Sequence, residues 1–354
     1  MAKIDHATVR VDAAELLRFC QIILGAQGVP EEQACYVAWH LVETNLRGTD
    51  THGVARLPHY VRRLKGQSIQ AQPAITYEQR APSLGLVDGD NGLGHLVMRD
   101  ATEKAGDLAS QTGAGWVAVK NSSHCGALAP YGLQLAERGM IAFVFSHVDP
   151  MVLPHGSRVP FCGTNPICIT APSLNGCAMC LDMATSVVPW NLIANAATEG
   201  VPIPSGWAVD RQGVDTNKPC EVHALYPFAQ HKGSGLGILI DILCSLLSGG
   251  PYGPDIPKMY GDMTEPRQLG GLVGAIHVEP FMESSIFRAR VSEIMRRLSG
   301  LPPSQGTDRV RFPGEPEIET KRIRSRDGIP MGVNVLAELN ELASHCGSQL
   351  LQPL

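Results

Sequence analysis

Helix-spaced apolar residues occupy both ends of this chain, whereas short strand-like runs alternate with helices in its middle. Near the N-terminus, Asp12 is placed to cap a helix that runs to about Gly25, and a second helix starts at Pro30 and continues toward Arg47. This order predicts an α/β core with a helical layer built from both termini. Further helices are predicted at 58–64, 95–112, 128–138, 190–199, 235–248, 285–298 and 333–345, and strands at 84–88, 116–119, 140–146, 166–171, 179–183 and 273–278.

The central sheet is predicted to be mixed and flanked by helices. Too few residues separate the strands 166–171 and 179–183 for a helical crossover, so these two strands are expected to pair antiparallel. The length of 354 residues suggests roughly two domains. We assign residues 1–65 with 283–354 to a helical domain and residues 66–282 to an α/β core.

Charge and hydropathy exclude some classes of partner. The net charge of −5 argues against nucleic acid, which requires a clustered basic surface. The one basic run, 321–326, is predicted to be a solvated turn or an oligomer contact. The longest apolar run, 235–248, contains Asp241 and is too short to span a bilayer, so we predict a buried helix there and no membrane partner.

The cysteines and the N-terminus indicate a cytoplasmic protein. The first six residues lack the apolar segment of a secretory signal, so the ten cysteines are expected to be free thiols in a reducing compartment. Cys177 and Cys180 form a C-x-x-C pair, but there is no second pair for a zinc site, and no metal is predicted.

A stretch between two predicted helices brings a hydroxyl, an imidazole and a guanidinium within six positions. Thr51 and His52 precede Arg56 on a segment that glycine and proline keep irregular. An imidazole exchanges protons near neutral pH, and a guanidinium suits a carboxylate. The motif therefore suggests chemistry on a small organic acid, although a packing histidine and a solvated arginine remain the alternatives.

Three further polar positions lie at the ends of predicted strands. His124 follows the strand 116–119 and is a candidate for proton transfer or substrate orientation, or an incidental residue near a helix start. Asp182 lies in an apolar strand, where it either pairs with a histidine or makes structural hydrogen bonds. Thr164, in a G-T-N-P sequence, offers a hydroxyl to substrate or belongs to an ordinary turn.

A glycine-rich helix start is a candidate anion site. Glycines at such a position let a phosphate approach backbone N–H groups, and Lys232 adds a positive charge. The spacing matches neither a Rossmann motif nor a Walker A loop, and a plain glycine-rich helix start is the competing interpretation. The segment consists of His231, Lys232, Gly233 and the residues to Gly237.

Eight short motifs follow one another in a fixed order along residues 12 to about 330. They are T-H-G-V-x-R-L-P, S-S-H-x-G-A, D-P-M-V-x-P-x-G, G-T-N-P, L-D-M-A-T-S, I-P-x-G-W-A-x-D, H-K-G-x-G-L and F-P-G-E. Together they resemble the type 2 malate/L-lactate dehydrogenase family, and most closely its ureidoglycolate dehydrogenase branch.

The resemblance implies a non-Rossmann nicotinamide-binding fold, a homodimer or larger assembly, and an active site near a subunit interface. It implies that His52 and His124 are catalytic or orient the substrate, that Asp182 and Thr51 support His52, and that Arg56 holds the substrate carboxylate. NAD or NADP would lie in the 66–282 core and against Asp182, Met183, Ala184, Lys232, Gly233, Gly314 and Glu315.

The chain departs from the family pattern at three places. Thr51 replaces a usual serine but keeps the hydroxyl; Val148 replaces a small polar residue that often contacts the cofactor; and Asn191-Leu192 replaces a common Gly-Lys. The predicted function is NAD(P)-dependent hydride transfer between nicotinamide and C2 of a small 2-hydroxy or 2-oxo acid. The alternatives are reduction of a cyclic imino acid and non-catalytic binding of a nucleotide or an acid.

Overall fold

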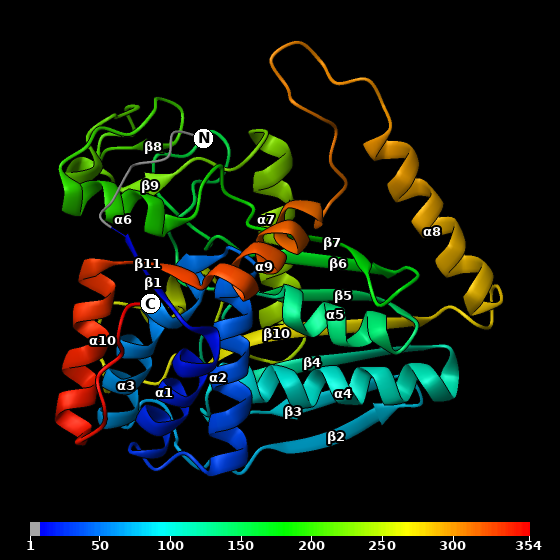
Figure 1. The fold of residues 1–354 in the computed structure, drawn as a ribbon, viewed down its shortest axis with the longest axis horizontal. Helices are drawn as coiled ribbons and strands as arrows, with labels where there is room; N and C mark the ends of the chain where they lie inside the picture. The colour runs from blue at the N-terminus through cyan, green and yellow to red at the C-terminus, as the bar shows by residue number, and fades with distance from the viewer. Residues whose placement is uncertain (1–7) are drawn as a thin grey trace.

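A computed structural model describes residues 8–354, so the N-terminal hexapeptide considered above lies outside the described residues. The helical layer from both termini is confirmed: helices from the two ends share one hydrophobic core (Figure 1). An antiparallel pair of strands, β1 (Thr8–Val11) with β11 (Ile329–Gly332), joins the two ends. The helices of this layer are α1 (Ala13–Gly25), α2 (Glu31–Leu46), α3 (Leu57–Lys65) and α10 (Val333–Cys346).

A mixed sheet of seven strands forms the centre of the molecule, as predicted. Only β3 and β4 run parallel; every other neighbouring pair is antiparallel, including the predicted pair β6 and β7. In spatial order the strands are β2 (Thr76–Ala81), β3 (Leu84–Asp88), β4 (Ala114–Ser122), β10 (Leu269–His277), β5 (Met140–Ser146), β6 (Ile167–Pro172) and β7 (Ala178–Met183).

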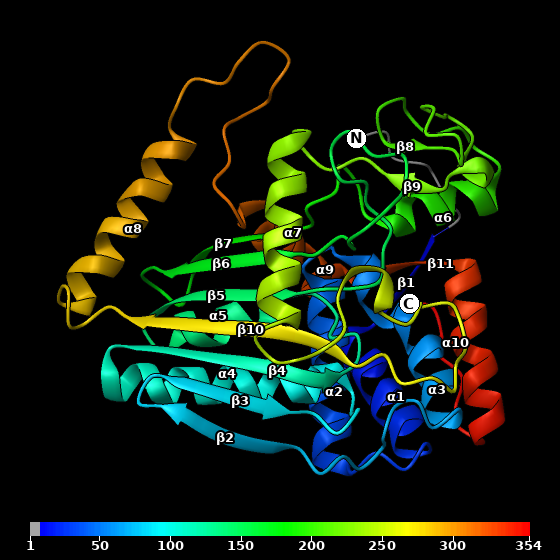
Figure 2. The same ribbon diagram turned by 180° about the vertical axis from the view of Figure 1, so that it is seen from behind.

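The two faces of the sheet are covered unequally. Helices α4 (Gly94–Thr112) and α5 (Ala129–Glu137) lie along one face, and α7 (His231–Ser245) crosses the other (Figures 1 and 2). The prediction of a buried helix at 235–248 is wrong, because Leu239, Ile242, Leu246 and Leu247 are 42–61% exposed. The helix packs one side on β10 and β5 and leaves an apolar side open.

Two segments lie outside this layered core. Helix α6 (Trp190–Glu199) packs with the short strands β8 (Ala208–Val209) and β9 (Ala224–Leu225) around a small core of their own. Helix α8 (Ser284–Ser299) projects from the body as an arm, not within the helical layer to which residues 283–354 were assigned, and it contacts β6 (Figure 1).

The basic run 321–326 was predicted to be a solvated turn or an oligomer contact. It is not a turn, because it belongs to helix α9 (Glu315–Asp327). Two of its cations bind the N-terminal layer. Lys321 Nζ lies 2.7 Å from Glu43 Oε1, and the Arg324 guanidinium makes two hydrogen bonds of 2.6 and 2.9 Å to the Asp50 carboxylate. The charged residues of α9 therefore hold the C-terminal part of the chain against the start of the turn that carries His52.

A buried asparagine shapes that turn. Asn45 Oδ1 accepts a hydrogen bond from the Val54 N–H at 2.8 Å, and its Nδ2 donates to Asp50 at 2.6 Å. Gly53 lies against this side chain, so closely that an added Cβ would be 2.1 Å from Asn45 Oδ1. The close approach explains the glycine after His52.

Two histidines are buried between α2 and α4. The rings of His40 and His95 lie 4.8 Å apart, edge to face, and neither side chain is exposed to solvent. None of their four ring nitrogens has a hydrogen-bond partner of good geometry among the described residues. Burial lowers the pKa of His95 from 6.5 to about 3, so this ring is neutral at physiological pH.

We expect Gly53→Ala to destabilise the protein by about 1–3 kcal/mol, because the new methyl group must displace the Asn45 side chain and its two hydrogen bonds. Denaturant unfolding measures the change. Gly25→Ala is the matched control, since nothing lies within 4 Å of an added Cβ there. Equal stability of the two variants would show that the turn relaxes freely.

We expect the free energy of unfolding to fall between pH 7 and pH 5, with His95 contributing about 2 kcal/mol of the loss. The unfolded chain binds a proton at His95 near pH 6.5, whereas the folded chain resists it down to about 3, so stability is lost as pH falls through this window. His95→Leu should remove that share of the loss, and His345→Gln, at an exposed position, should not. An unchanged pH dependence in His95→Leu would contradict the lowered pKa.

Candidate active site

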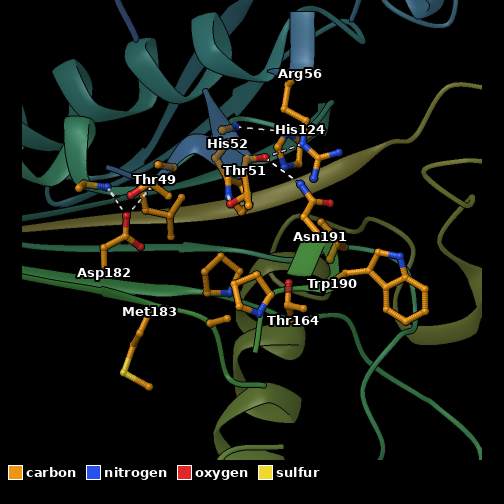
Figure 3. Close-up of a pocket in the computed structure, with 18 of the residues that line it drawn as sticks. Thr49, Thr51, His52, Arg56, His124, Thr164, Asp182, Met183, Trp190 and Asn191 are labelled. Atoms are coloured by element: carbon orange, nitrogen blue, oxygen red, sulfur yellow. Dashed lines mark hydrogen bonds between the residues drawn. The ribbon is translucent and has the colours of Figure 1, made fainter. Parts of the chain in front are cut away.

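Segments from distant parts of the chain converge on one pocket, with a cavity of about 190 Å³ (Figure 3). They include the turn with Thr51, His52 and Arg56; the loop with His124 between β4 and α5; the end of β7; the start of α6; and the Met259–Tyr260 loop. The structure thus brings together side chains that are far apart in the sequence. Of the predicted site residues, Thr51, His52, Arg56, His124, Thr164, Asp182, Met183 and Ala184 line this pocket.

Two stacked imidazoles line the pocket. The rings of His52 and His124 are 5.7 Å apart and inclined by 22°. Each Nδ1 is engaged: that of His52 lies 2.9 Å from Thr51 Oγ1, and that of His124 lies 2.7 Å from Tyr60 Oη. Each Nε2 has no hydrogen bond within the described residues and remains accessible from the pocket. Two ring nitrogens are therefore available to one ligand.

The environment keeps both rings neutral. Burial, and then the charge of Arg56, lowers the pKa of His52 to about 4. Burial and the neighbouring His52 lower the pKa of His124 well below its ordinary value. At neutral pH each ring thus has one hydrogen and one lone pair, and both can exchange hydrogen bonds with an oxygen atom.

Arg56 lies beside the histidine pair with part of its guanidinium free. Its Nε donates to the Thr51 carbonyl at 2.8 Å, and its Nη1 bonds Tyr260 Oη. Asn191 Nδ2 donates to the same Thr51 carbonyl at 3.0 Å. These bonds hold the guanidinium in place, while Nη2 makes no hydrogen bond within residues 8–354 and can bind an anion.

Asp182 does not pair with a histidine, contrary to one expectation. Its Oδ2 accepts hydrogen bonds from the N–H groups of Leu128 (3.0 Å) and Ala129 (2.8 Å), at the start of α5. The side chain is open to the pocket, but dense protein around it raises the pKa of Asp182 to about 6, an effect that these two hydrogen bonds oppose. Asp182 is therefore part of the wall and does not orient His52 directly.

The outer edge of β7 is suited to an amide-bearing ligand. β7 is the last strand of the sheet, and its Cys180 N–H points outward to the Pro313 carbonyl at 3.0 Å. By the alternation of strand backbone, the N–H and C=O of Asp182 point the same way. A carboxamide, such as that of nicotinamide, fits such an adjacent donor and acceptor, with Met183 and Trp190 as apolar neighbours.

The other predicted cofactor residues do not line the pocket. Gly314 has a φ of +92°, and a Cβ there would be 3.0 Å from the Cys180 carbonyl. The Glu315 carboxylate already has partners within the chain, since it accepts a hydrogen bond from the Phe312 N–H and lies 3.5 Å from Arg309.

The predicted anion site at the start of α7 is separate from the pocket lining. His231, Lys232 and Gly233 form the first turn of α7 and are not among the residues lining the pocket. Their cofactor role stays a prediction.

The sequence analysis did not identify Tyr60 and Tyr260 as site residues. Tyr60 contacts His124, and Tyr260 contacts Arg56. In the sequence, Tyr60 is one apolar position of a short amphipathic helix, where a core tyrosine looks the same. Tyr260 lies in a loop, about 200 positions from its partner Arg56. No local pattern links either residue to a histidine or an arginine.

Other predicted properties concern ions, thiols and membranes. All ten cysteines are free thiols, as predicted. Among residues 8–354, no three His, Cys, Asp or Glu side chains are grouped as metal ligands. In the same range, no helix combines the length and apolarity needed to cross a bilayer.

Sequence comparison finds close relatives along almost the whole chain. The chain is 35% identical to a malate dehydrogenase of Pyrococcus abyssi, over 99% of this chain and 98% of that protein. It is 34% identical to an ureidoglycolate dehydrogenase (NAD(+)) of Escherichia coli, over 85% of this chain and 86% of the relative.

Solved structures agree with the sequence matches. The malate dehydrogenase of Pyrococcus horikoshii superposes with a TM-score of 0.90 at 33% identity and covers 99% of both chains. A Δ1-piperideine-2-carboxylate reductase of Pseudomonas syringae gives 0.84 at 29% identity, over 94% of this chain and 99% of that one. Residues 11–340 match the family model for malate/L-lactate dehydrogenase. The chain belongs to the malate/L-lactate dehydrogenase family.

Proposed function

We propose that this protein is an NAD(P)-dependent oxidoreductase that transfers hydride between nicotinamide and C2 of a small 2-hydroxy or 2-oxo acid. The observation that carries this proposal is the pair of neutral, stacked imidazoles, open at both Nε2 atoms, beside the free Nη2 of Arg56. A 2-hydroxy acid has an oxygen and a carboxylate on adjacent carbons, which match these two kinds of group. Relatives named malate and ureidoglycolate dehydrogenase support the assignment.

Each side chain then has a defined task. Arg56 binds the carboxylate, His52 and His124 contact the oxygen on C2, and Thr51 and Thr164 provide hydroxyl groups at the wall. Bound nicotinamide supplies the hydride acceptor or donor.

We propose that the edge of β7 at Asp182, Met183 and Ala184 holds the carboxamide of the nicotinamide. The more distant parts of NAD or NADP would lie toward Gly314 and Glu315 and toward His231, Lys232 and Gly233.

Reduction of a cyclic imino acid is the second candidate. A Δ1-piperideine-2-carboxylate reductase superposes on this chain over nearly its full length. Such a substrate also carries a carboxylate next to the reacting carbon, so Arg56 would serve both reactions. The two reactions differ in the group that is reduced, C=N in a cyclic imino acid and C=O in a 2-oxo acid. In either case the two histidines would contact this group.

We also propose a homodimer or larger assembly in a reducing compartment, the cytoplasm. The open side of α7 exposes Leu239, Ile242 and Leu246, and the same face of the sheet exposes Leu84 and Leu181. An apolar area of this kind on a soluble protein is typical of an interface. Ten free thiols agree with a reducing environment.

We expect turnover of nicotinamide, followed by absorbance, with at least one member of a panel of 2-oxo acids, 2-hydroxy acids and cyclic imino acids, tested with both cofactors. His52→Ala and His124→Ala should each lower kcat/KM by about 10²–10⁴. Arg56→Lys should mainly raise the substrate KM, because the planar fork is lost. His345→Gln is the control. Wild-type binding of NADH without turnover of any substrate would favour a non-catalytic binding protein.

We expect Ile242→Glu with Leu246→Glu to convert the assembly to monomers, because two charges cannot be buried in an apolar interface. Light scattering after size exclusion measures the mass. Val214→Glu, at a side chain 60% exposed in the segment between β8 and β9, should leave the mass unchanged. A monomeric wild type would contradict the proposed assembly.

A further inference from the structure

The hydroxyl of Tyr60 has one hydrogen-bond partner in the structure. Tyr60 lies on α3 and is fully buried, and its Oη is 2.7 Å from Nδ1 of His124. The neighbouring imidazole of His95 stands edge-on at 5.1 Å between ring centroids, but neither of its nitrogens has a partner. No second acceptor for the Tyr60 hydrogen is present among residues 8–354.

This isolation decides where the hydrogen atoms lie. If His124 carried its hydrogen on Nδ1, the hydroxyl hydrogen of Tyr60 would be buried without an acceptor, at a cost of about 1–3 kcal/mol. The backbone N–H of Gly126 also points at Nδ1, at 3.4 Å, and an N–H group can only donate. Both neighbours therefore require Nδ1 to be an acceptor, and the single hydrogen of the neutral ring lies on Nε2.

We propose that Tyr60 is a positioning residue that holds His124 in the Nε2–H tautomer, so that His124 donates a hydrogen bond to the substrate oxygen and proton transfer falls to His52. This inference rests on the proposed function for the identity of the ligand, but not for the state of the ring. Burial raises the pKa of Tyr60 above its ordinary value, which keeps its hydroxyl a donor.

His52 is free to take the complementary role. Thr51 Oγ1 is a hydroxyl oxygen and can accept the Nδ1 hydrogen of His52, which leaves a lone pair on the accessible Nε2. In oxidation of a 2-hydroxy acid, the C2–H bond breaks and its hydride leaves to the nicotinamide. The O–H bond breaks as its proton passes to Nε2 of His52, and the C=O bond forms. The oxygen keeps the hydrogen bond from Nε2–H of His124 throughout, and reduction is the reverse.

A neutral imidazole that donates is suited to the second role. It stabilises negative charge developing on the oxygen without giving up its own hydrogen, because an imidazolate would be far too basic. His52 and His124 would therefore differ in function, although both lie on segments that connect regular elements. The difference arises from what each Nδ1 contacts: an adaptable hydroxyl at Thr51 and a buried donor at Tyr60.

The tautomer is measured directly by long-range ¹H–¹⁵N correlation spectra of the full protein with ¹⁵N-labelled histidine. The His124 signals are assigned by their loss in His124→Gln. We expect the Nε2–H pattern in the wild type and a mixture of tautomers in Tyr60→Phe. An Nδ1–H pattern in the wild type, or an unchanged pattern in Tyr60→Phe, would overturn the proposal.

Tyr131→Phe is the matched control. Tyr131 is equally buried, and its hydroxyl donates to the Cys125 carbonyl at 2.7 Å in the loop that carries His124, but it does not contact the ring. We expect Tyr60→Phe to lower kcat about tenfold, the value of one hydrogen bond, with little change in cofactor KM. Tyr131→Phe should leave the His124 spectrum unchanged. If both variants lower kcat equally with unchanged spectra, Tyr60 is only structural.

The two measurements separate two kinds of failure. If no acid or imine is turned over, the proposed function fails, and the spectra still decide the tautomer of His124. If turnover is observed and the His124 spectrum does not depend on Tyr60, the proposed function stands and the role of Tyr60 is refuted.

Discussion

The side chain of Asn45 holds the short turn on which the site depends. It is buried at the end of α2, accepts the Val54 N–H and donates to Asp50, and Asp50 is bound in turn by Arg324 from near the C-terminus. A chain segment without regular structure needs such bonds to satisfy its backbone and to stay in one conformation. Because both ends of the protein contribute, the position of His52 depends on the completed tertiary structure.

The site combines polar groups with a dry environment. Two imidazoles lie next to a guanidinium, yet burial and the positive charge keep both rings neutral. Neutral rings can exchange hydrogen bonds with a substrate oxygen without first losing a proton. The guanidinium is held by the Thr51 carbonyl and Tyr260, so it is oriented before any anion arrives. Such advance orientation lowers the reorganisation needed during the reaction.

The errors of the sequence predictions have physical causes. Helix α9 was missed because it is charged on every side, so apolar periodicity could not reveal it; it is held by ion pairs to α2 and to the turn instead. β2 was missed because its side chains are polar at the edge of the sheet. The sequence predicts α7 to be buried because apolar residues surround the helix, but only one side meets the sheet. Of the two interpretations of Asp182, the structure shows the structural hydrogen bonds and not the pairing with a histidine, because the free N–H groups at the start of α5 bind its carboxylate.

The sequence by itself determined the helices α1, α2, α3 and α10 of the two ends, most strands of the mixed sheet, the family and eight of the residues that line the pocket, because periodicity and short motifs are local properties of a chain. Only the tertiary structure decided which groups touch: Tyr60 with His124, Tyr260 with Arg56, and Asp182 with the first turn of α5. The physical reason is that hydrogen bonds act over about 3 Å. Whether two residues 64 or 204 positions apart come that close depends on how all the intervening elements pack.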